Sequence, residues 1–442
     1  MLHQYSGFFR TYVAQSVEDM RADQGQPLKS FKGAAPDRNV HSRGQNTPES
    51  EKARSRLISL LKVWGPAWLV MIADVDAASV ITAAESGAVY GTKLVWFLFV
   101  LSLPLYVIQE VAGRVGAVTG KGLGELIREN YSKQTALLAS IPMALVDVIS
   151  YVVEYTGAAI GFQILGIAPV ISVPLVFVAH ILIVYERKYA EAEKPLLVVS
   201  VLFAVAWATS AFLTARNGVE VTVFYVSTSS NFLFLLTANV GAVIMPFMLF
   251  YQASATAEKG ITKKHLWAVR LETAVGAIVS ELIMIAIAVA TIGVKSDSLN
   301  FADPEILSHG LSSVAGTFAP YVFGIGLIAA SFIALIVISL GSSWGVTEAL
   351  GWGRKNWFKL YLVESLPALI VPMLTLNLVN LALNLMVLQI VVLMGPAITL
   401  GLISSDKNLM GEYSLAGLNK GAYWFFTVLI FGTGLIGIVT LF

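Results

Sequence analysis

Apolar segments long enough to cross a bilayer recur along most of the chain, separated by short polar stretches. Crossing the hydrocarbon core as an α-helix takes about 20 residues. We place eleven such spans at residues 64–88, 94–113, 136–164, 168–185, 195–214, 231–256, 272–294, 319–341, 358–377, 380–403 and 422–442. The ninth and tenth run together, and we expect the turn between them at Asn377–Asn380. The pattern predicts an all-α polytopic membrane protein embedded in a lipid bilayer.

Composition agrees with this pattern and excludes several classes of protein. Charged residues make up 13% of the 442, hydrophobic residues 56%, and the mean hydropathy is +0.74. A soluble domain has about 25% charged residues, so an ordinary water-soluble enzyme is excluded. The net charge of +1 gives no argument for nucleic-acid binding. There is no cysteine, the five histidines are scattered, and no nucleophile–base pair or cofactor motif is present, so we expect neither an enzyme nor a bound cofactor.

The charges concentrate in residues 1–62, which hold 16 of them. We interpret this segment as a cytosolic polar tail, mostly disordered. It has no long apolar run after a basic start and is not a secretory signal. With the N-terminus in the cytosol, 26 Lys and Arg residues fall on the cytosolic side and three on the outside. Positive residues favour the cytosolic side, so we expect a multi-pass protein of the cell membrane with this orientation.

The first span carries two carboxylates, Asp74 and Asp76, near its middle. An ionisable group inside a span is costly unless it faces a partner or water. No basic residue shares this helix, so the pair favours a cation. Asp76 and Ser79 share one helix face, whereas Asp74 points to the opposite face if the helix is continuous. The alternative is that each Asp forms a hydrogen bond to a neighbouring helix.

The sixth span contains a proline that would break its hydrogen-bond pattern. Pro246 lacks an N–H and frees a carbonyl one turn earlier, near Ala242. In a bilayer that carbonyl needs another partner, and a cation can serve. Met245 would add a soft sulfur ligand, which favours transition metals. Proline kinks and methionines also occur in membrane helices for packing alone.

Other polar residues inside spans are candidates for a second shell or a pathway. Asp147, Tyr151 and Glu154 form a stripe on one face of the third span, suited to proton or cation passage or to interhelical hydrogen bonds. Asn239, Asn384 and Gln389 could complete a coordination shell, and Glu281 is a further acid on a pathway. Glu348 and Glu364 have less support. Gly157 and Gly161 form a GxxxG pattern that predicts close helix packing.

The first and sixth spans lie five spans apart. Transporters built from two inverted five-helix repeats bind substrate where the first helix of each repeat is broken, near the midplane. We therefore divide the chain into the tail (1–62), a first repeat (63–214), a second repeat (231–403) and an eleventh helix (422–442).

At several of these positions the sequence resembles the NRAMP family of divalent metal transporters. The similar stretches are Gly65-Pro66, Asp76, Val118-Thr119-Gly120-Lys121, Ala242, Met245-Pro246 and Ser404–Gly411. The resemblance implies a LeuT-type fold and, in most members, proton-coupled uptake of Mn²⁺ or Fe²⁺. It places the metal ligands at Asp76, Ser79, Ala242 and Met245. We keep Asp74, Asn239, Asn384 and Gln389 as candidates for further ligands or for a second shell. The metal is substrate, and protons are a second candidate partner.

The sequence also departs from the family pattern. The Asp-Pro-Gly-Asn signature of the first helix is here Asp76-Ala77-Ala78-Ser79, and alanine, the best helix former, does not explain an unwound turn. The Met-Pro-His-Asn signature is here Met245-Pro246-Phe247-Met248, and the acidic pair of the third helix falls on Tyr151 and Glu154.

These departures are more similar to a divergent branch that includes the NRAMP-related magnesium transporters, which leaves Mg²⁺ beside Mn²⁺ and Fe²⁺ as a candidate substrate. We expect a secondary transporter of divalent cations working by alternating access. A transporter of an organic solute such as an amino acid, or a receptor that has lost transport, are the alternatives. The oligomeric state does not follow from the sequence.

Overall fold

The structure is a computed structural model, and it describes residues 60, 63–186, 189–216, 218, 220, 222, 224–294, 303–352, 356–373 and 378–441. The helices described below belong to one compact unit, Trp64–Phe442. The polar tail predicted over residues 1–62 lies outside the described residues, apart from Leu60.

The described part of this unit consists of helices joined by short turns. Its first half contains α3 (Pro66–Ala73), α4 (Ala77–Tyr90), η1 (Gly91–Leu94), α5 (Val95–Thr119), α6 (Leu123–Asn130), α7 (Lys133–Ile164), α8 (Pro169–Glu186) and α9 (Tyr189–Ala215). Its second half contains α10 (Ser230–Gly241), α11 (Pro246–Glu258), η2 (Lys263–His265), α12 (Leu266–Ala290), α13 (Pro304–Ala315), α14 (Ala319–Leu350), α15 (Trp357–Ser365), α16 (Pro367–Ile370), η4 (Val371–Met373), α17 (Leu378–Ser405), α18 (Lys407–Met410), η5 (Gly411–Tyr413) and α19 (Gly417–Leu441).

Among the described residues, helices lie in each of the eleven ranges predicted from hydrophobicity. The first span corresponds to α3 and α4, and the sixth to α10 and α11, so each of these two is broken into a pair. By length and composition, eight stretches of the described helices could cross a membrane, counting α4 to α5 as one stretch and α10 to α11 as another. The number of eleven crossings stays a prediction.

Two details of the span boundaries differ from the prediction. The turn expected at Asn377–Asn380 is wrong at its second half, because α17 already begins at Leu378 and Asn380 lies inside it; residues 374–377 lie outside the described part. The short helices α6 and α13 were not predicted, since each has too few apolar residues for a span.

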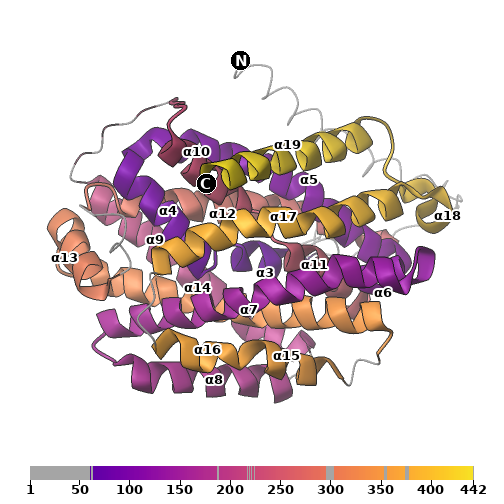
Figure 1. The fold of residues 1–442 in the computed structure, drawn as a ribbon, viewed down its shortest axis with the longest axis horizontal. Coiled ribbons are helices and arrows are strands. Elements are labelled where there is room, and N and C mark those ends of the chain that lie inside the picture. Colours follow the sequence, from indigo (N-terminus) through magenta and orange to yellow (C-terminus); the bar gives the residue numbers. More distant parts are fainter. Residues whose placement is uncertain are drawn as a thin grey trace, which may run out of the picture. The chain divides into compact units, whose positions relative to one another are not determined.

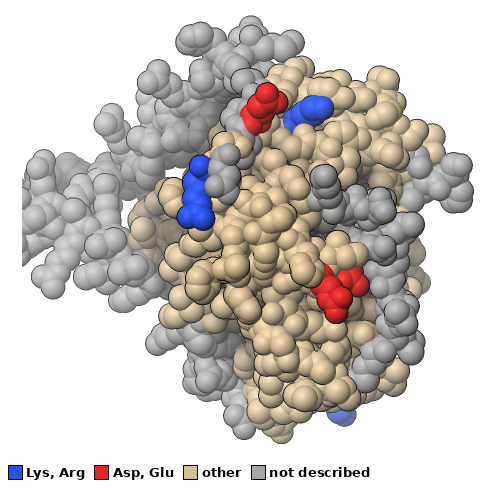
Figure 2. Space-filling model, turned by 90° about the vertical axis from the view of Figure 1, so that its left-hand side faces the viewer, with Lys and Arg blue, Asp and Glu red and all other residues tan. Residues whose placement is uncertain are grey.

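The long helices lie side by side and form a bundle. In Figure 1, α7, α17 and α19 run across the view, with α6 and α18 at the right-hand end and α13 at the left-hand end. Short, more polar helices at both ends of an apolar bundle are what a bilayer-spanning protein requires. Figure 2 looks onto the end that holds α13, where acidic and basic side chains are few among the described atoms.

Glycines allow the closest helix contacts, as the GxxxG pattern of the third span predicts. A Cβ atom added at Gly157 would collide with the Cβ of Ala77 in α4. One added at Gly161 would stand 2.6 Å from the Gly324 carbonyl of α14. The α7 helix is thereby packed against the start of α4, where the first broken helix resumes.

Candidate metal site at two helix breaks

The break in the first helix lies at Asp74–Asp76. Asp76 is extended (φ −77°, ψ 178°), and its Oδ1 accepts the backbone N–H of Ser79 at 2.7 Å. Aspartate is among the best N-cap residues, so Asp76 begins α4, and Ala77 and Ala78 become its first two helical residues. The break does not need the Pro-Gly of the family signature, because α3 ends at Ala73, before the two alanines, and these begin α4.

Carboxylates from other helices cap both halves of this broken helix. Glu272 of α12 accepts the N–H groups of Gly65 and Trp68 at 2.6 and 2.8 Å, at the start of α3. Glu154 of α7 accepts the N–H of Ala77 at 3.0 Å, at the start of α4. The first N–H groups of a helix have no partner within the helix, and in a buried site these acids supply one. The structure thus gives Glu154 a capping role beside Asp76.

The break in the sixth helix lies where the proline predicts it. Helix α10 ends at Gly241, and Pro246 occupies the first position of α11, where its missing N–H costs nothing. Met245 before it is extended and fully buried. The residues between the two helices, Ala242–Met245, leave backbone groups free of the helical pattern.

The two breaks lie next to each other in the core. The Ser79 hydroxyl donates a hydrogen bond to the Ala242 carbonyl at 3.1 Å. Its Oγ is also 4.0 Å from the Sδ of Met386 in α17. Asp76, Ser79, Ala242, Met245 and Met386 are at most 1% exposed. Ser79 thus contacts a carboxylate through its N–H and a carbonyl and a thioether through its hydroxyl.

Met386 is the member of this group that sequence reasoning missed. Nothing distinguishes it locally from other apolar residues of the tenth span. It reaches the site because Gly241 has no side chain, so the end of α10 packs directly on the Met386 backbone.

The other candidate residues of this region separate into two groups. Asn239 donates to Ser86 Oγ and to the Leu235 carbonyl, and Gln389 donates to Ser150 Oγ, so both amides serve to link helices. Asn384 is exposed and does not join the site.

Asp74 and Glu281 are buried, their carboxylate oxygens form no hydrogen bonds, and their charges lie close enough to interact with each other. Asp76 is also within electrostatic reach of Asp74. Three carboxyl groups thus lie near one another around the first break, and carboxyl oxygens are ligands for divalent cations.

On α7, Asp147, Tyr151 and Glu154 are all fully buried, as a functional stripe requires. The Tyr151 hydroxyl donates to Ser339 Oγ at 3.1 Å, and that oxygen also lies 2.9 Å from His180 Nε2. Passage of protons or cations along this stripe stays a prediction.

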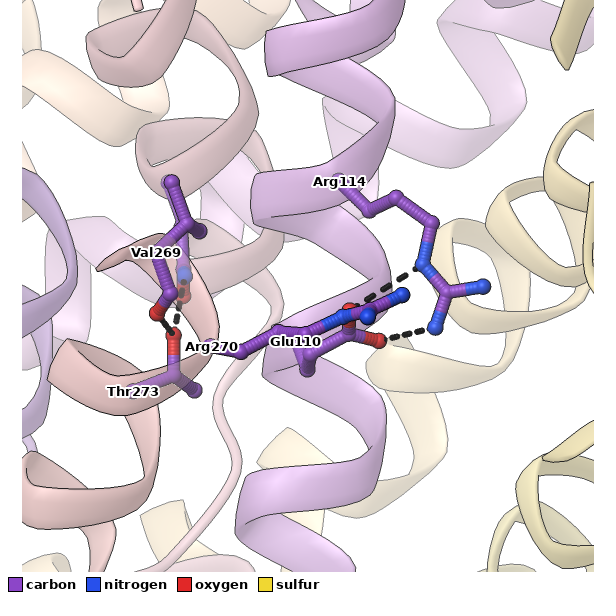
Figure 3. Close-up of polar contacts among 6 residues, drawn as sticks. Glu110, Arg114, Val269, Arg270 and Thr273 are labelled. Atoms are coloured by element: carbon purple, nitrogen blue, oxygen red, sulfur yellow. Dashed lines mark hydrogen bonds and ion pairs between the residues drawn. The ribbon is translucent and has the colours of Figure 1, made fainter. Parts of the chain in front are cut away.

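Basic side chains in the core are already paired. Glu110 of α5 pairs with Arg114 one turn along the same helix and with Arg270 of α12, which joins the two helices (Figure 3). Within the described part of the chain, no group of three or more His, Cys, Asp or Glu side chains could hold a metal ion. A metal at the breaks would therefore need the carbonyl, hydroxyl and thioether donors as well as Asp76.

The comparison with known families agrees with this geometry. The model of the Nramp family, described as natural resistance-associated macrophage protein-like, matches residues 67–440. The chain belongs to the Nramp family. It is accordingly a multi-pass membrane protein that transports divalent metal cations.

Solved transporters share the fold. A manganese transporter from Eremococcus coleocola, in complex with an aromatic bis-isothiourea substituted compound, is 17% identical, covers 87% of each chain and has a TM-score of 0.73. MhsT in complex with L-phenylalanine is 15% identical over 88% of this chain and 98% of its own, with a TM-score of 0.56. MHP1, a nucleobase-cation-symport-1 family transporter, is 13% identical over 85% of this chain and 89% of its own, also at 0.56. The expected LeuT-type fold is confirmed.

Two Nramp-like stretches hold the loops next to α6 and α18. The loop that contains Lys121 packs on Glu348 of α14, which accepts the N–H of Gly124 at 3.2 Å and the hydroxyl of Ser254 at 2.8 Å. Asp406 caps α18 by accepting the N–H of Asn408 at 2.8 Å. Both stretches therefore stabilise the turns at this end of the bundle.

Proposed function

We propose that this Nramp protein carries Mn²⁺ or Fe²⁺ across the cell membrane by alternating access, and that the ion binds between the two helix breaks. Asp76 supplies the negative charge, the Ala242 carbonyl and Ser79 hydroxyl supply neutral oxygens, and Met245 and Met386 supply sulfur. The N-terminus lies in the cytosol.

The hydrogen bond from Ser79 to the Ala242 carbonyl carries this proposal. It brings the first and sixth helices together at their breaks, about halfway along the bundle. The second carboxylate oxygen of Asp76 is buried and has no hydrogen-bond partner. An incoming cation would satisfy that oxygen and replace the serine hydroxyl at the carbonyl.

The thioether sulfur atoms favour binding of transition metals over Mg²⁺ at this site. Thioethers are soft ligands, whereas Mg²⁺ and Ca²⁺ take oxygen ligands and Mg²⁺ keeps several waters. Met245 is fully buried at the N-terminus of α11, and the Met386 sulfur faces Ser79. We therefore expect Mn²⁺ to be preferred over Mg²⁺ and Ca²⁺.

An organic solute is less well supported. MhsT is described with L-phenylalanine and MHP1 with bromovinylhydantoin, and both share the fold. In this chain, however, the carboxyl groups of Asp74, Asp76 and Glu281 offer no positive partner for the carboxylate of an amino acid.

Uptake of Mn²⁺ and Mg²⁺ into proteoliposomes tests the proposal. Asp76→Asn should reduce Mn²⁺ uptake to the level of empty liposomes, because it removes the only charged ligand that we assign. Met386→Ala and Met245→Ala should lower the ratio of Mn²⁺ to Mg²⁺ uptake by about tenfold, the effect of losing about 1.4 kcal/mol of preferential binding.

Met394→Ala is the matched control. Met394 lies on the same helix as Met386 but is 43% exposed, so its replacement should leave selectivity unchanged. Normal Mn²⁺ uptake by Asp76→Asn would reject the site, and an unchanged ratio in both inner methionine variants would reject the sulfur ligands.

A further inference from the structure

Three polar side chains from three helices meet in the core away from the helix breaks. They are Asp147 of α7, Ser342 of α14 and Glu364 of α15, and these helices pack against one another in pairs. Asp147 and Ser342 are fully buried, and Glu364 is 4% exposed. The two carboxyl groups lie close enough for their charges to interact, and the Ser342 hydroxyl faces both of them.

Buried polar oxygens normally form hydrogen bonds, and these do not. The Ser342 hydroxyl stands near both carboxyl groups, but none of the four carboxylate oxygens forms a hydrogen bond of normal geometry with it or with any other described residue. Buried carboxylates without partners are costly, and two side by side are more so. Arg114 and Arg270 both engage Glu110 (Figure 3), and no ion pair of the described residues includes Asp147 or Glu364.

We propose that Asp147, Glu364 and Ser342 form a second divalent-cation site, separate from the one at the helix breaks. A cation would neutralise both carboxylates and give the unpartnered hydroxyl an electrostatic partner. Two carboxylates and a hydroxyl are hard oxygen donors, which suit Mg²⁺, Ca²⁺ and Mn²⁺ alike. This site is therefore less selective than the first, which has sulfur ligands.

Helix α7 connects the second site to the first. Asp147 precedes Glu154, the residue that caps α4 beside Asp76, by seven positions, or about 10 Å along α7. Tyr151 lies between them and is held by Ser339. Asp147 is nearer the Lys133 end of α7, which the charge distribution places in the cytosol. We infer that ions leaving toward the cytosol bind at this second site in passing, and this role rests on the proposed function. The ligands assigned to the second site do not depend on that function.

Mn²⁺ binding to the purified full-length protein in lipid nanodiscs, measured by equilibrium dialysis, tests the proposal. The unchanged protein should bind two ions. Glu364→Gln and Asp147→Asn should each bind one, Asp76→Asn should bind one, and Asp76→Asn with Glu364→Gln should bind none. Glu412→Gln, at an exposed position outside the bundle core, is the control and should bind two.

The outcomes separate the two sites. If Glu364→Gln and Asp147→Asn bind as many ions as the unchanged protein, the carboxyl pair holds protons and the second site is rejected. If Asp76→Asn loses no ion, the site of the proposed function fails while the second site stands.

Two further measurements do not depend on the Asp147 and Glu364 variants folding. Ser342→Ala keeps both carboxylates and should weaken Mn²⁺ binding at one of the two sites about tenfold, with the thermal unfolding temperature of the metal-free protein little changed; undiminished binding at both sites would contradict the ligand set. In Asp76→Asn, Ca²⁺ should displace the remaining Mn²⁺, and failure to do so would overturn the assignment of hard oxygen ligands.

Discussion

At the scale of single residues, buried carboxylates hold the broken first helix in place. Glu154 accepts the N–H of Ala77 in a fully buried setting, so removing the acceptor leaves a donor without a partner. We expect Glu154→Ala to be less stable than Glu154→Gln by about 1–3 kcal/mol, because the glutamine oxygen can still accept the hydrogen bond. Thermal unfolding of the two purified variants in one detergent measures this difference.

The exposed Glu412 provides the control pair for that comparison. Glu412→Ala and Glu412→Gln should unfold at nearly the same temperature. If Glu154→Ala and Glu154→Gln also unfold at nearly the same temperature, Glu154 does not cap α4.

Other single residues show how far the sequence could predict the site. Asp76 and Pro246 can be recognised from the local sequence. Asp76 is a charged residue inside an apolar span, Pro246 lacks the N–H that a helix needs, and both lie at the breaks. Whether Asn384 faces the core depends on the rotation of α17 about its own axis, and this rotation could not be predicted from the hydrophobic pattern. Met386 is placed by contacts between distant helices, and no local signal indicates it. Glu364 is visible as an acid in the ninth span, but no local signal pairs it with Asp147.

At the scale of elements, the position of the first break could not be predicted for a physical reason. Ala77-Ala78 favours helix, and it is indeed helical. The chain leaves the helix earlier because Asp76 caps α4 and because α7 and α12 supply the acids that satisfy the free N–H groups. Those partners lie 77 and 207 positions away.

The contact between α7 and α4 gives a prediction at the same scale. Gly157→Val would place side-chain atoms where Ala77 already lies and 3.0 Å or less from Ser331 Oγ. Overpacking of this kind costs about 1–3 kcal/mol, so we expect lower thermal stability and loss of Mn²⁺ uptake.

Gly432→Val in α19 is the matched control, because an added Cβ there meets no atom within 4 Å. It should leave stability and uptake unchanged. If Gly157→Val behaves like Gly432→Val, the close packing of α7 on α4 is wrong.

At the scale of the whole molecule, the distribution of positive charge predicts which end faces the cytosol. The chain has no cysteine, so single cysteines can be introduced without background labelling. Lys420→Cys, in the first turn of α19, and Glu220→Cys, between α9 and α10, replace exposed residues. In intact cells, a membrane-impermeant maleimide should label the cysteine at 220 and leave the one at 420 unlabelled until the membrane is opened. Labelling of both positions from outside would contradict the predicted orientation.

The central claim is that a divalent transition metal binds between the two broken helices. Anomalous diffraction from crystals of the protein grown with Mn²⁺ tests it most directly, because the signal locates the metal itself. We predict a manganese peak in contact with the Asp76 carboxylate and the Ala242 carbonyl, with the sulfur atoms of Met245 and Met386 nearby. Manganese peaks found elsewhere in the protein, with none between Asp76 and Ala242, would contradict the account.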